Sequence, residues 1–345
     1  MKLKTRMLKH PSGIEIETPL FIPSYSSKGF ALIKNHDGEL KSEICKAIGI
    51  AKEMLEECQL VSAYDIHYNY LLDPTELVST KLIFIDSGGY ETSSSFDFAE
   101  TQRDNSNHNE WNIAYLDTVI NKWPNERFPA VIVSFDDEKV RKPITEQIND
   151  ASKLFDKHKD YLHDFLIKPE TAKSDYIKID SVLKNINLLK DFDIIGVTEK
   201  ELGHSILERM QRINKIRNSL DAARIKAPIH VFGSLDPITV ILYFLAGAEI
   251  FDGLTWLKYS YYNGIAMYTN NLCALDKNIE ISTIDTQVKA TSIVNNIHYL
   301  SRLKNILINF TKSNSNFNLF DELGYTGLGK IIQNNYEIFN NRIKK

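Results

Sequence analysis

Two short segments of the chain place an acidic side chain and glycine directly after a run of apolar residues. Residues 84–90 are Phe-Ile-Asp-Ser-Gly-Gly-Tyr, and residues 247–254 are Gly-Ala-Glu-Ile-Phe-Asp-Gly-Leu. Each pattern predicts a strand that ends on a carboxylate, Asp86 or Asp252, where glycine lets another molecule approach the backbone. Such a carboxylate is either hidden or used for chemistry. For the first segment, a tight turn after an edge strand is the alternative.

The elements that position these acids follow a regular order along the chain. Short apolar, β-branched runs alternate with helical patterns, as in βα units around a parallel sheet. The predicted strands are 19–23, 59–63, 82–86, 130–135, 164–168, 193–197, 229–232 and 249–251, and the helices between them are 43–58, 112–122, 144–159, 178–190, 204–219 and 237–246. Eight such strands predict an α/β fold, a (β/α)8 TIM barrel with its site at the C-terminal strand ends. An open doubly wound sheet is the competitor, but no Gly-x-Gly-x-x-Gly turn follows the first strand.

The pattern changes after the eighth strand. We expect a barrel domain over residues 1–280 and C-terminal helices packed on it over 281–345, with helices at 286–310 and 317–343. The polar segment 91–109 is long for a βα loop. It is typical of a lid or binding loop, with a disordered excursion as the alternative.

Composition limits the class of protein. With 345 residues and 43% hydrophobic residues the chain can bury a large core. A net charge of −4 argues against a polybasic nucleic-acid binder but leaves a local basic groove open. Three widely spaced cysteines cannot build a disulfide framework, and no apolar run approaches the ~18 residues of a membrane span. We therefore expect a soluble, cytoplasmic protein.

Polar residues gather at the predicted strand ends, and several of them are acidic. In strand order they are Asp86 and Ser87, Asp136 and Asp137, Lys168, Thr198 and Glu199, Gly233 and Ser234, and Asp252. Acids on one rim repel each other unless a metal, a cationic substrate or a base with several donors lies among them. A metal without histidine ligands would be Mg²⁺ or Ca²⁺, and no calcium-type loop is present. We predict no metal site and no cofactor.

Five motifs, in order along the first 265 residues, resemble those of the tRNA-guanine transglycosylases, the queuine and archaeosine tRNA-ribosyltransferases. Residues 18–23 (TPLFIP) are similar to the family's Thr-Pro-x-Phe-x-Pro, and 86–90 (DSGGY) to Asp-Ser-Gly-Gly-(Phe/Tyr)-Gln. Residues 134–137 (SFDD) resemble Phe-Asp-Glu, 251–253 (FDG) Phe-Asp-Cys, and 263–264 (NG) Arg-Asn-Gly. No single match is specific, but the ordered set is.

The resemblance implies base exchange, in which guanine in a polynucleotide is replaced by a 7-deazaguanine of the preQ0 or preQ1 type. Breaking and remaking a glycosidic bond with retention requires two carboxylates. By motif match, Asp252 would be the nucleophile that forms a covalent sugar intermediate. Asp86 would be the acid that helps guanine leave. The alternative for Asp252 is a helix cap after a buried strand.

The resemblance also implies how the base is bound. Asp136 would accept the N1–H and amine hydrogen bonds of the guanine edge. Tyr90 and Phe232 would lie on opposite faces of the ring, with ordinary core packing as the alternative for each. The remaining base contacts would come from Ser87, Gly196 and Val197.

Departures from the family pattern bear on the substrate. The family's zinc clasp needs three cysteines and a histidine, and this chain has only Cys273 and the distant His298 in that region, which excludes four-coordinate zinc unless another chain contributes ligands. The chain therefore resembles a branch of the family without the clasp. Its absence slightly favours a likeness to the relatives that modify DNA over those that modify tRNA. Lys168 stands where glutamine is typical. It would donate to the base, or form an ion pair with Asp136 without a ligand role.

The expected partner is nucleic acid, DNA or tRNA, with an extruded base, and no membrane. Candidates for phosphate contacts are Lys258, Lys28 and Arg103, with His108 and Lys139. A homodimer and an accessory protein both stay open. Two other functions also stay open: a non-catalytic relative that binds nucleic acid or a partner subunit, and a hydrolase of free nucleosides or sugars.

Overall fold

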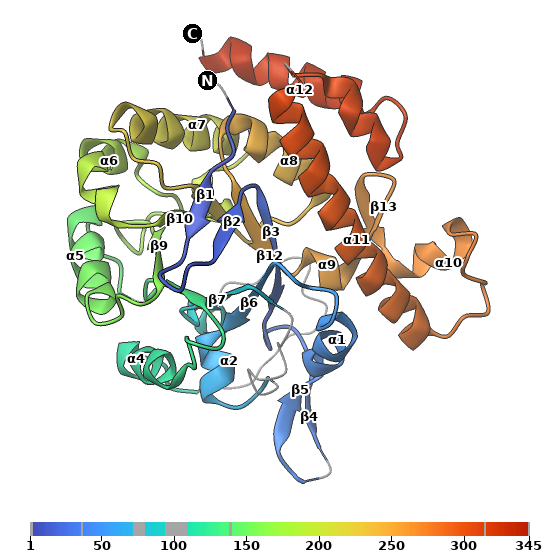
Figure 1. Ribbon diagram of the computed structural model, residues 1–345, viewed down its shortest axis with the longest axis horizontal. Coiled ribbons are helices and arrows are strands. Elements are labelled where there is room, and N and C mark those ends of the chain that lie inside the picture. The colour runs from blue at the N-terminus through green and yellow to red at the C-terminus, as the bar shows by residue number, and fades with distance from the viewer. Residues whose placement is uncertain are drawn as a thin grey trace.

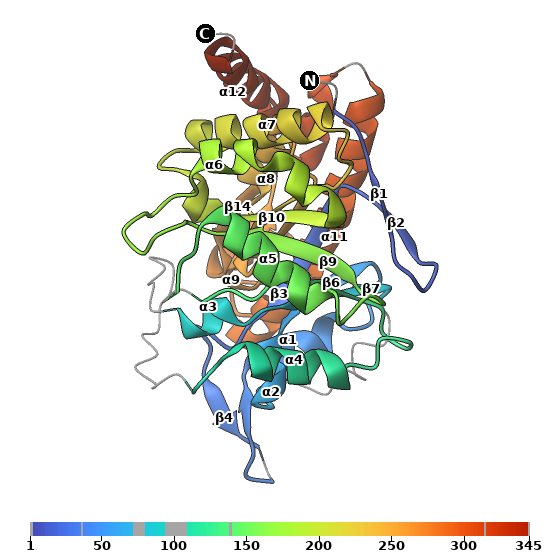
Figure 2. The same ribbon diagram turned by 90° about the vertical axis from the view of Figure 1, so that its left-hand side faces the viewer.

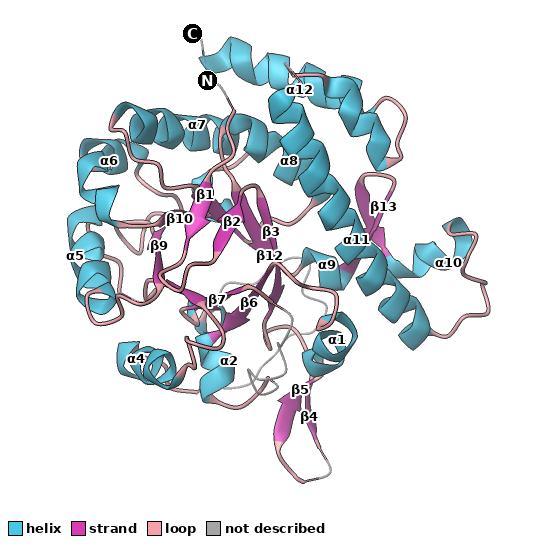
Figure 3. Cartoon of the chain, viewed as in Figure 1, coloured by secondary structure: helices cyan, strands magenta, loops and turns pink. Residues whose placement is uncertain are grey.

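The chain forms a closed barrel of parallel strands in the computed structural model, which describes residues 3–35, 37–71, 80–93, 109–137, 140–313 and 315–343. The barrel strands are paired in the circular order β3, β6, β7, β8, β9, β10, β11, β12 (Figure 1, Figure 3). Their bounds are β3 Leu20–Tyr25, β6 Cys58–Ser62, β7 Leu82–Asp86, β8 Ala130–Val133, β9 Leu162–Ile167, β10 Ile194–Thr198, β11 Ile229–Phe232 and β12 Ile250–Gly253. The predicted (β/α)8 barrel is confirmed.

Helices follow the barrel strands along the chain, and the longer ones cover the outside of the barrel, as Figure 2 shows from the side. They are α1 Ile44–Ala51, α2 Ala63–His67, α3 Gly89–Thr92, α4 Ile113–Lys122, α5 Ile144–Phe155, α6 Ile179–Lys184, α7 Ile206–Ala222, α8 Pro237–Ala246 and α9 Thr255–Lys258, with 3-10 turns η2 Ile186–Asp191 and η3 Glu199–Leu202. The predicted helix over 43–58 was too long, because Cys58 already pairs with Leu82 as the first residue of β6. The predicted helix over 178–190 divides at Asn185 into α6 and η2.

The first barrel strand is displaced toward the C-terminus relative to the prediction. Residues 19–23 were expected, but β3 continues through Ser24 and Tyr25, which pair with Leu60 and Val61 of β6. All six residues of β3 are buried. This extension brings the Ser24 hydroxyl to the same end of the barrel as the predicted acids.

Alternation along the strands divides the apolar core into two layers. Inward residues such as Leu20, Ile22, Phe84 and Ile250 fill the barrel interior. Outward residues such as Phe21 pack against the helices. This is the period-2 pattern of strands covered on both faces. The interior therefore offers few places for a polar side chain except near its open end.

Three antiparallel hairpins extend from the barrel. They are β1 Met7–Lys9 with β2 Glu15–Glu17, β4 Leu32–Lys34 with β5 Leu40–Ser42, and β13 Tyr259–Tyr262 with β14 Ile265–Tyr268. The β4–β5 hairpin projects from the body in both ribbon views (Figure 1, Figure 2). None of the helices in the described ranges has the length and apolarity that crossing a membrane requires.

The C-terminal region is helical and packs on the barrel. After η4 Thr269–Asn271 and α10 Leu272–Leu275, the long helix α11 Asp285–Lys312 packs against α1 and β13. The second predicted helix, 317–343, was wrong in its first part: η5 Phe317–Leu323 is separated from α12 Leu328–Ile343 by Gly324 and Gly327, both with left-handed backbone. The division at residue 280 stays a prediction.

Asn296 of α11 fastens this helix to the barrel. Its side chain is fully buried, accepts a hydrogen bond from the Tyr261 N–H at 2.7 Å, and donates to the carbonyls of Trp256 and Tyr259, each at 2.7 Å. Buried backbone groups that lose such a partner cost free energy because water cannot replace it. The amide therefore joins three otherwise unpaired groups around the short helix α9.

We expect Asn296→Ala to lower the free energy of unfolding by about 2 to 4 kcal/mol, because it leaves buried backbone groups unpaired. Chemical denaturation of both proteins measures this loss. Asn295→Ala is the matched control, since Asn295 is only half-buried on the same helix. Equal losses in the two variants would contradict the fastening role of Asn296.

Candidate active site

A cavity of about 780 Å³ opens at the C-terminal ends of the barrel strands. This is the end at which barrels of this type carry their sites. Of the residues predicted for the site, those that line the cavity are Asp86, Asp252, Asp136, Ser87, Tyr90, Phe232, Lys168 and Lys258. Gly196 and Val197 lie deeper in β10 and do not line it, so their contacts with a base stay a prediction.

Asp252 lies on β12, and its carboxylate accepts hydrogen bonds from two groups of the barrel rim. Its Oδ2 accepts from the Ser24 hydroxyl at 2.8 Å, and its Oδ1 accepts from the Gly233 N–H at 2.9 Å. The Gly253 N–H donates in turn to the Ser24 hydroxyl at 3.1 Å. The N-cap of α9 is Leu254, so Asp252 does not cap that helix. Its carboxylate is oriented from two sides and still borders the cavity.

Asp86 ends β7 and has a different environment. Protein surrounds its side chain, which nevertheless borders the open cavity, and its Oδ2 accepts from the Gly88 N–H at 3.1 Å. Burial, together with the charges of Glu91 and Asp252, raises the pKa of Asp86 to about 7. Asp86 is thus protonated in a large fraction of molecules at neutral pH.

A buried acid and two serines stand behind Asp86. Glu91 is 3% exposed and accepts hydrogen bonds from the hydroxyls of Ser26 and Ser62, the second at 2.7 Å. Next to it, Asp65 accepts from the Ser27 N–H and hydroxyl. Burial first, and then Glu91, raises the pKa of Asp65 well above its usual range. Glu91 was noted in the sequence only for its place after the aromatic residue.

Gly88 and Gly89 are required because neighbouring side chains leave no room for a Cβ atom at these positions. Gly88 has a left-handed backbone with φ +83°, and a Cβ there would lie 2.7 Å from the Trp111 Nε1 atom. A Cβ on Gly89 would lie 3.0 Å from the Asp136 Oδ2 atom. The Trp111 indole donates to the Ser87 carbonyl at 2.8 Å. The glycines therefore bring the end of β7 against Asp136.

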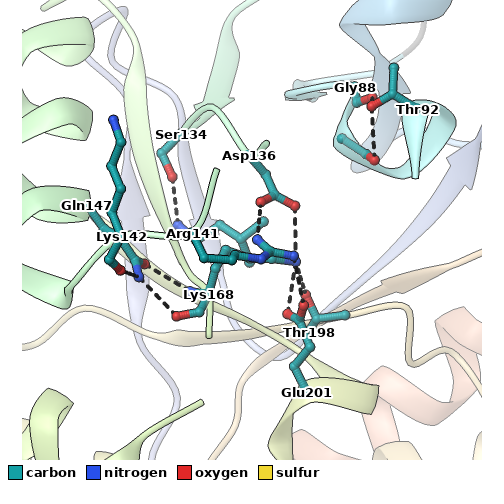
Figure 4. Close-up of polar contacts among 12 residues, drawn as sticks. Gly88, Thr92, Ser134, Asp136, Arg141, Lys142, Gln147, Lys168, Thr198 and Glu201 are labelled. Atoms are coloured by element: carbon teal, nitrogen blue, oxygen red, sulfur yellow. Dashed lines mark hydrogen bonds and ion pairs between the residues drawn. The ribbon is translucent and has the colours of Figure 1, made fainter. Parts of the chain in front are cut away.

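Asp136 is the centre of an ion-pair network beside the end of β7 (Figure 4). Its Oδ1 pairs with Arg141 at 2.6 Å and its Oδ2 with Lys168 at 3.1 Å. Lys168 also pairs with Glu201 at 2.8 Å and donates to the Thr198 hydroxyl at 3.3 Å. The ion pair that the sequence left open for Lys168 is present.

The ammonium of Lys168 lies within 3.3 Å of three protein groups, the carboxylates of Asp136 and Glu201 and the Thr198 hydroxyl. Burial would lower its pKa, but the carboxylates of Asp136 and Glu201 outweigh burial, and its pKa is raised. Lys168 is therefore charged and fixed. Arg141 and Glu201 were not singled out from the sequence, because Arg141 follows no strand and Glu201 lies in η3 beyond the end of β10.

The predicted aromatic residues both reach the cavity, in different environments. Phe232 is 8% exposed and stacks on the ring of His230 with centroids 3.8 Å apart. Tyr90 is half-buried, and the Lys28 ammonium lies 4.5 Å from its ring centroid. Whether they enclose a base stays a prediction.

The predicted phosphate contacts are dispersed. Lys258 lies in α9 and borders the cavity, whereas Lys28 donates to the carbonyls of Tyr90 and Ser93, each at 2.9 Å. Arg103 lies outside the described residues, as do His108 and Lys139. Of the predicted phosphate contacts that lie in the described ranges, Lys258 borders the cavity and Lys28 does not.

The region of the missing zinc clasp is separate from the cavity. Cys273 lies in the short helix α10, and His298 is exposed on α11. In the described ranges, no three histidine, cysteine or acidic side chains are arranged to hold a metal ion.

We expect Glu91→Gln to lower the pKa of Asp86, because the variant removes a neighbouring negative charge. The raised pKa makes the folded protein bind this proton more tightly than the unfolded chain, so the fold loses stability as pH rises from about 4 to about 7. The variant should show a smaller loss. Titration of the Asp86 carboxyl carbon by NMR, with denaturation at several pH values, measures both effects.

Glu337→Gln is the control for this measurement, since Glu337 is exposed on α12. It should leave the Asp86 titration near pH 7. An Asp86 carboxyl that titrates identically in the Glu91 variant would show that Glu91 does not act on it.

Comparison with protein-family models and with curated proteins found no match for this chain.

Proposed function

We propose that the protein is a base-exchange transglycosylase that replaces guanine in nucleic acid by a 7-deazaguanine of the preQ0 or preQ1 type. The observation that carries this proposal is the pair Asp86 and Asp252, which border one cavity at the barrel mouth in different environments. Asp252 has fixed hydrogen-bond donors, and Asp86 has a pKa of about 7. Two carboxyl groups in different environments are suited to the roles of nucleophile and acid. Barrels of this type commonly carry enzymes, and the motif resemblance names the reaction.

In the first step, an Asp252 oxygen attacks the sugar carbon C1′ as the bond from C1′ to guanine N9 breaks. The electron pair of that bond goes to the base, and the Asp86 carboxyl proton goes with it, so guanine leaves neutral. The product is a covalent sugar ester of Asp252. Ser24 and Gly233 hold the carboxylate in place for this attack.

In the second step, the incoming 7-deazaguanine attacks C1′ through N9. The bond from C1′ to Asp252 breaks, and its electrons return to the carboxylate. Asp86, now ionised, takes the N9 proton. Taken together, the two steps return Asp86 and Asp252 to their starting states, so no cofactor is consumed.

Asp136 is suited to the base edge although both of its oxygens are already paired. A carboxylate has about four lone-pair sites, so two can face Arg141 and Lys168 while two accept from the N1–H and amine of guanine. The two cations pair with this carboxylate and fix its orientation. Tyr90 and Phe232 supply ring surfaces for the extruded base.

DNA is slightly favoured as the polymer, because the chain lacks the residues of the zinc clasp that tRNA-modifying relatives carry. A base must be extruded from either polymer, and this costs least in a loop or a melted strand. Lys258 borders the cavity, and we expect it to meet a phosphate of the polymer. A homodimer or an accessory protein that opens duplex DNA is compatible with this proposal.

A second candidate is a non-catalytic relative that binds nucleic acid or a partner subunit. The observation in its favour is a network of ion pairs around Asp136, the residue predicted to bind the base. Asp136 pairs with Arg141 and Lys168, and Lys168 also pairs with Glu201, so these charges have partners without a ligand. It predicts binding without exchange.

We expect the protein to incorporate labelled guanine into DNA or tRNA, and Asp252→Ala to abolish this and the covalent adduct. Asp86→Ala should slow exchange by about 100-fold or more, the usual contribution of a positioned acid. Scintillation counting of the polymers and mass spectrometry of the protein measure exchange and adduct. Asp285→Asn, on the exposed start of α11, is the control.

Each result separates the candidates. Exchange that survives Asp252→Ala would overturn the covalent mechanism. Polymer binding without exchange of any purine would favour the non-catalytic relative, and release of free base without exchange would favour a hydrolase.

The rate of guanine release in a single turnover should fall by about 10-fold per pH unit above pH 7, since Asp86 must carry a proton to act as the acid. Asp86→Asn should remove this pH dependence and leave a slow residual rate. Rapid-quench measurements between pH 5.5 and 9 test both expectations. A wild-type rate that is constant over this range would exclude Asp86 as the acid.

A further inference from the structure

A histidine and an aspartate are buried in the barrel interior directly beneath Asp252. The His230 Nδ1 atom lies 2.7 Å from the Asp164 Oδ2 atom, and both side chains are 0% exposed. The His230 Nε2 atom faces Asp252 and lies 3.5 Å from its Oδ1 atom. These side chains come from three strands: β9, β11 and β12. The mechanism above uses neither His230 nor Asp164.

The pair lies in an otherwise apolar layer that fixes the imidazole. The Phe232 ring stacks on it at 3.8 Å, and the Phe84 ring meets it edge-on at 5.7 Å. Gly196 leaves room for this arrangement, since a Cβ there would lie 2.7 Å from Phe232 and 2.8 Å from the Asp164 Oδ1 atom. The ring therefore has one orientation, with Nδ1 toward Asp164 and Nε2 toward Asp252.

Burying such a pair is costly, and packed apolar residues would stabilise the barrel at least as well. Within the described residues, the Asp164 Oδ1 and His230 Nε2 atoms have no hydrogen-bond partner. The contact of 3.5 Å between Nε2 and the Asp252 Oδ1 atom is an ion pair. An arrangement that leaves polar atoms unsatisfied in a core requires an explanation beyond stability.

The pKa values of both members of the pair are shifted upward. Burial lowers the pKa of His230, but the carboxylates of Asp164 and Asp252 outweigh burial and raise it to about 9. Burial also raises the pKa of Asp164, which His230 opposes. We assign the proton to His230, because the carboxylates of Asp164 and Asp252 lie on the two sides of its ring and both attract a positive imidazole. The groups that face His230 are thus two carboxylates and two phenyl rings.

We propose that His230 is a positioning residue for Asp252: held by Asp164, its imidazolium orients the Asp252 carboxylate and stabilises it when the bond from C1′ breaks. This inference rests on the proposed function. In the second step the electrons of the broken bond return to Asp252, and the cation beneath it favours that return. His230 neither gives nor takes a proton in either step.

The first experiment does not depend on the proposed function. Nitrogen-15 NMR titration of the intact protein should show His230 protonated at pH 7 and titrating near 9. Asp164→Asn and Asp252→Asn should each lower this pKa. The nitrogen-15 signals of the exposed His298 should be the same in both variants as in the wild type. A neutral His230 at pH 7, or a titration unaffected by Asp252→Asn, would overturn the proposal.

The second experiment measures the two steps separately. His230→Gln retains a donor but has no charge, so we expect the sugar adduct of Asp252 to form and then to break down about 10- to 100-fold more slowly, the range of a hydrogen bond to a charged group. The adduct should accumulate during turnover. A merely structural role would slow both steps or lower the amount of folded protein. His298→Gln is the control.

The outcomes distinguish the two proposals. If the wild-type protein exchanges no base, the proposed function fails, and the NMR titration alone decides whether His230 is the charged partner of Asp252. If exchange occurs but His230→Gln leaves adduct breakdown unchanged, the positioning role is overturned while the proposed function stands. Should His230→Gln fold poorly, Asp164→Asn provides the same kinetic test with the imidazole retained.

Discussion

Holding several carboxylates at one end of a barrel has an electrostatic cost, and the side chains around the mouth of this barrel are arranged to meet it. Each acid meets that cost differently. Asp252 is held by Ser24, Gly233 and the cation beneath it, and Asp136 by Arg141 and Lys168. Asp86, which has fewer partners, retains its proton up to about pH 7. The differences in chemistry among these acids therefore follow from their partners, because the side chains themselves are alike.

The barrel supplies these partners by closing. Ser24 reaches Asp252 because β3 and β12 are neighbours in the closed sheet, although 228 positions separate the two residues in the chain. Gly89 and Gly196 remove side-chain bulk where two strands must bring polar groups into contact. A small residue at such a position allows another segment of the chain to come close, just as it allows a ligand to come close.

The outer shell fixes the mouth from a distance. Asn296 of α11 holds the backbone around Trp256, whose indole donates to the Ser24 carbonyl at 3.2 Å. The same strand residue, Ser24, contacts Asp252 through its hydroxyl. The C-terminal helices are thus connected to the site through buried hydrogen bonds, and their packing is part of what orients the carboxylate.

Alternation and the transition from apolar to polar residues are local properties of the chain, so the sequence alone was enough to predict the eight strands, their parallel order and the acids at their ends. It left Lys168 open between a ligand role and an ion pair, and it assigned no mechanistic role to Glu91, Arg141 or His230. The ion pairs of Lys168 and the partners of these residues are visible only in the folded molecule, since strand register and barrel closure set which side chains meet across the interior. His230 lies within an ordinary apolar strand pattern. Its importance appears only when Asp164 and Asp252, distant in the chain, are brought to the two sides of its ring.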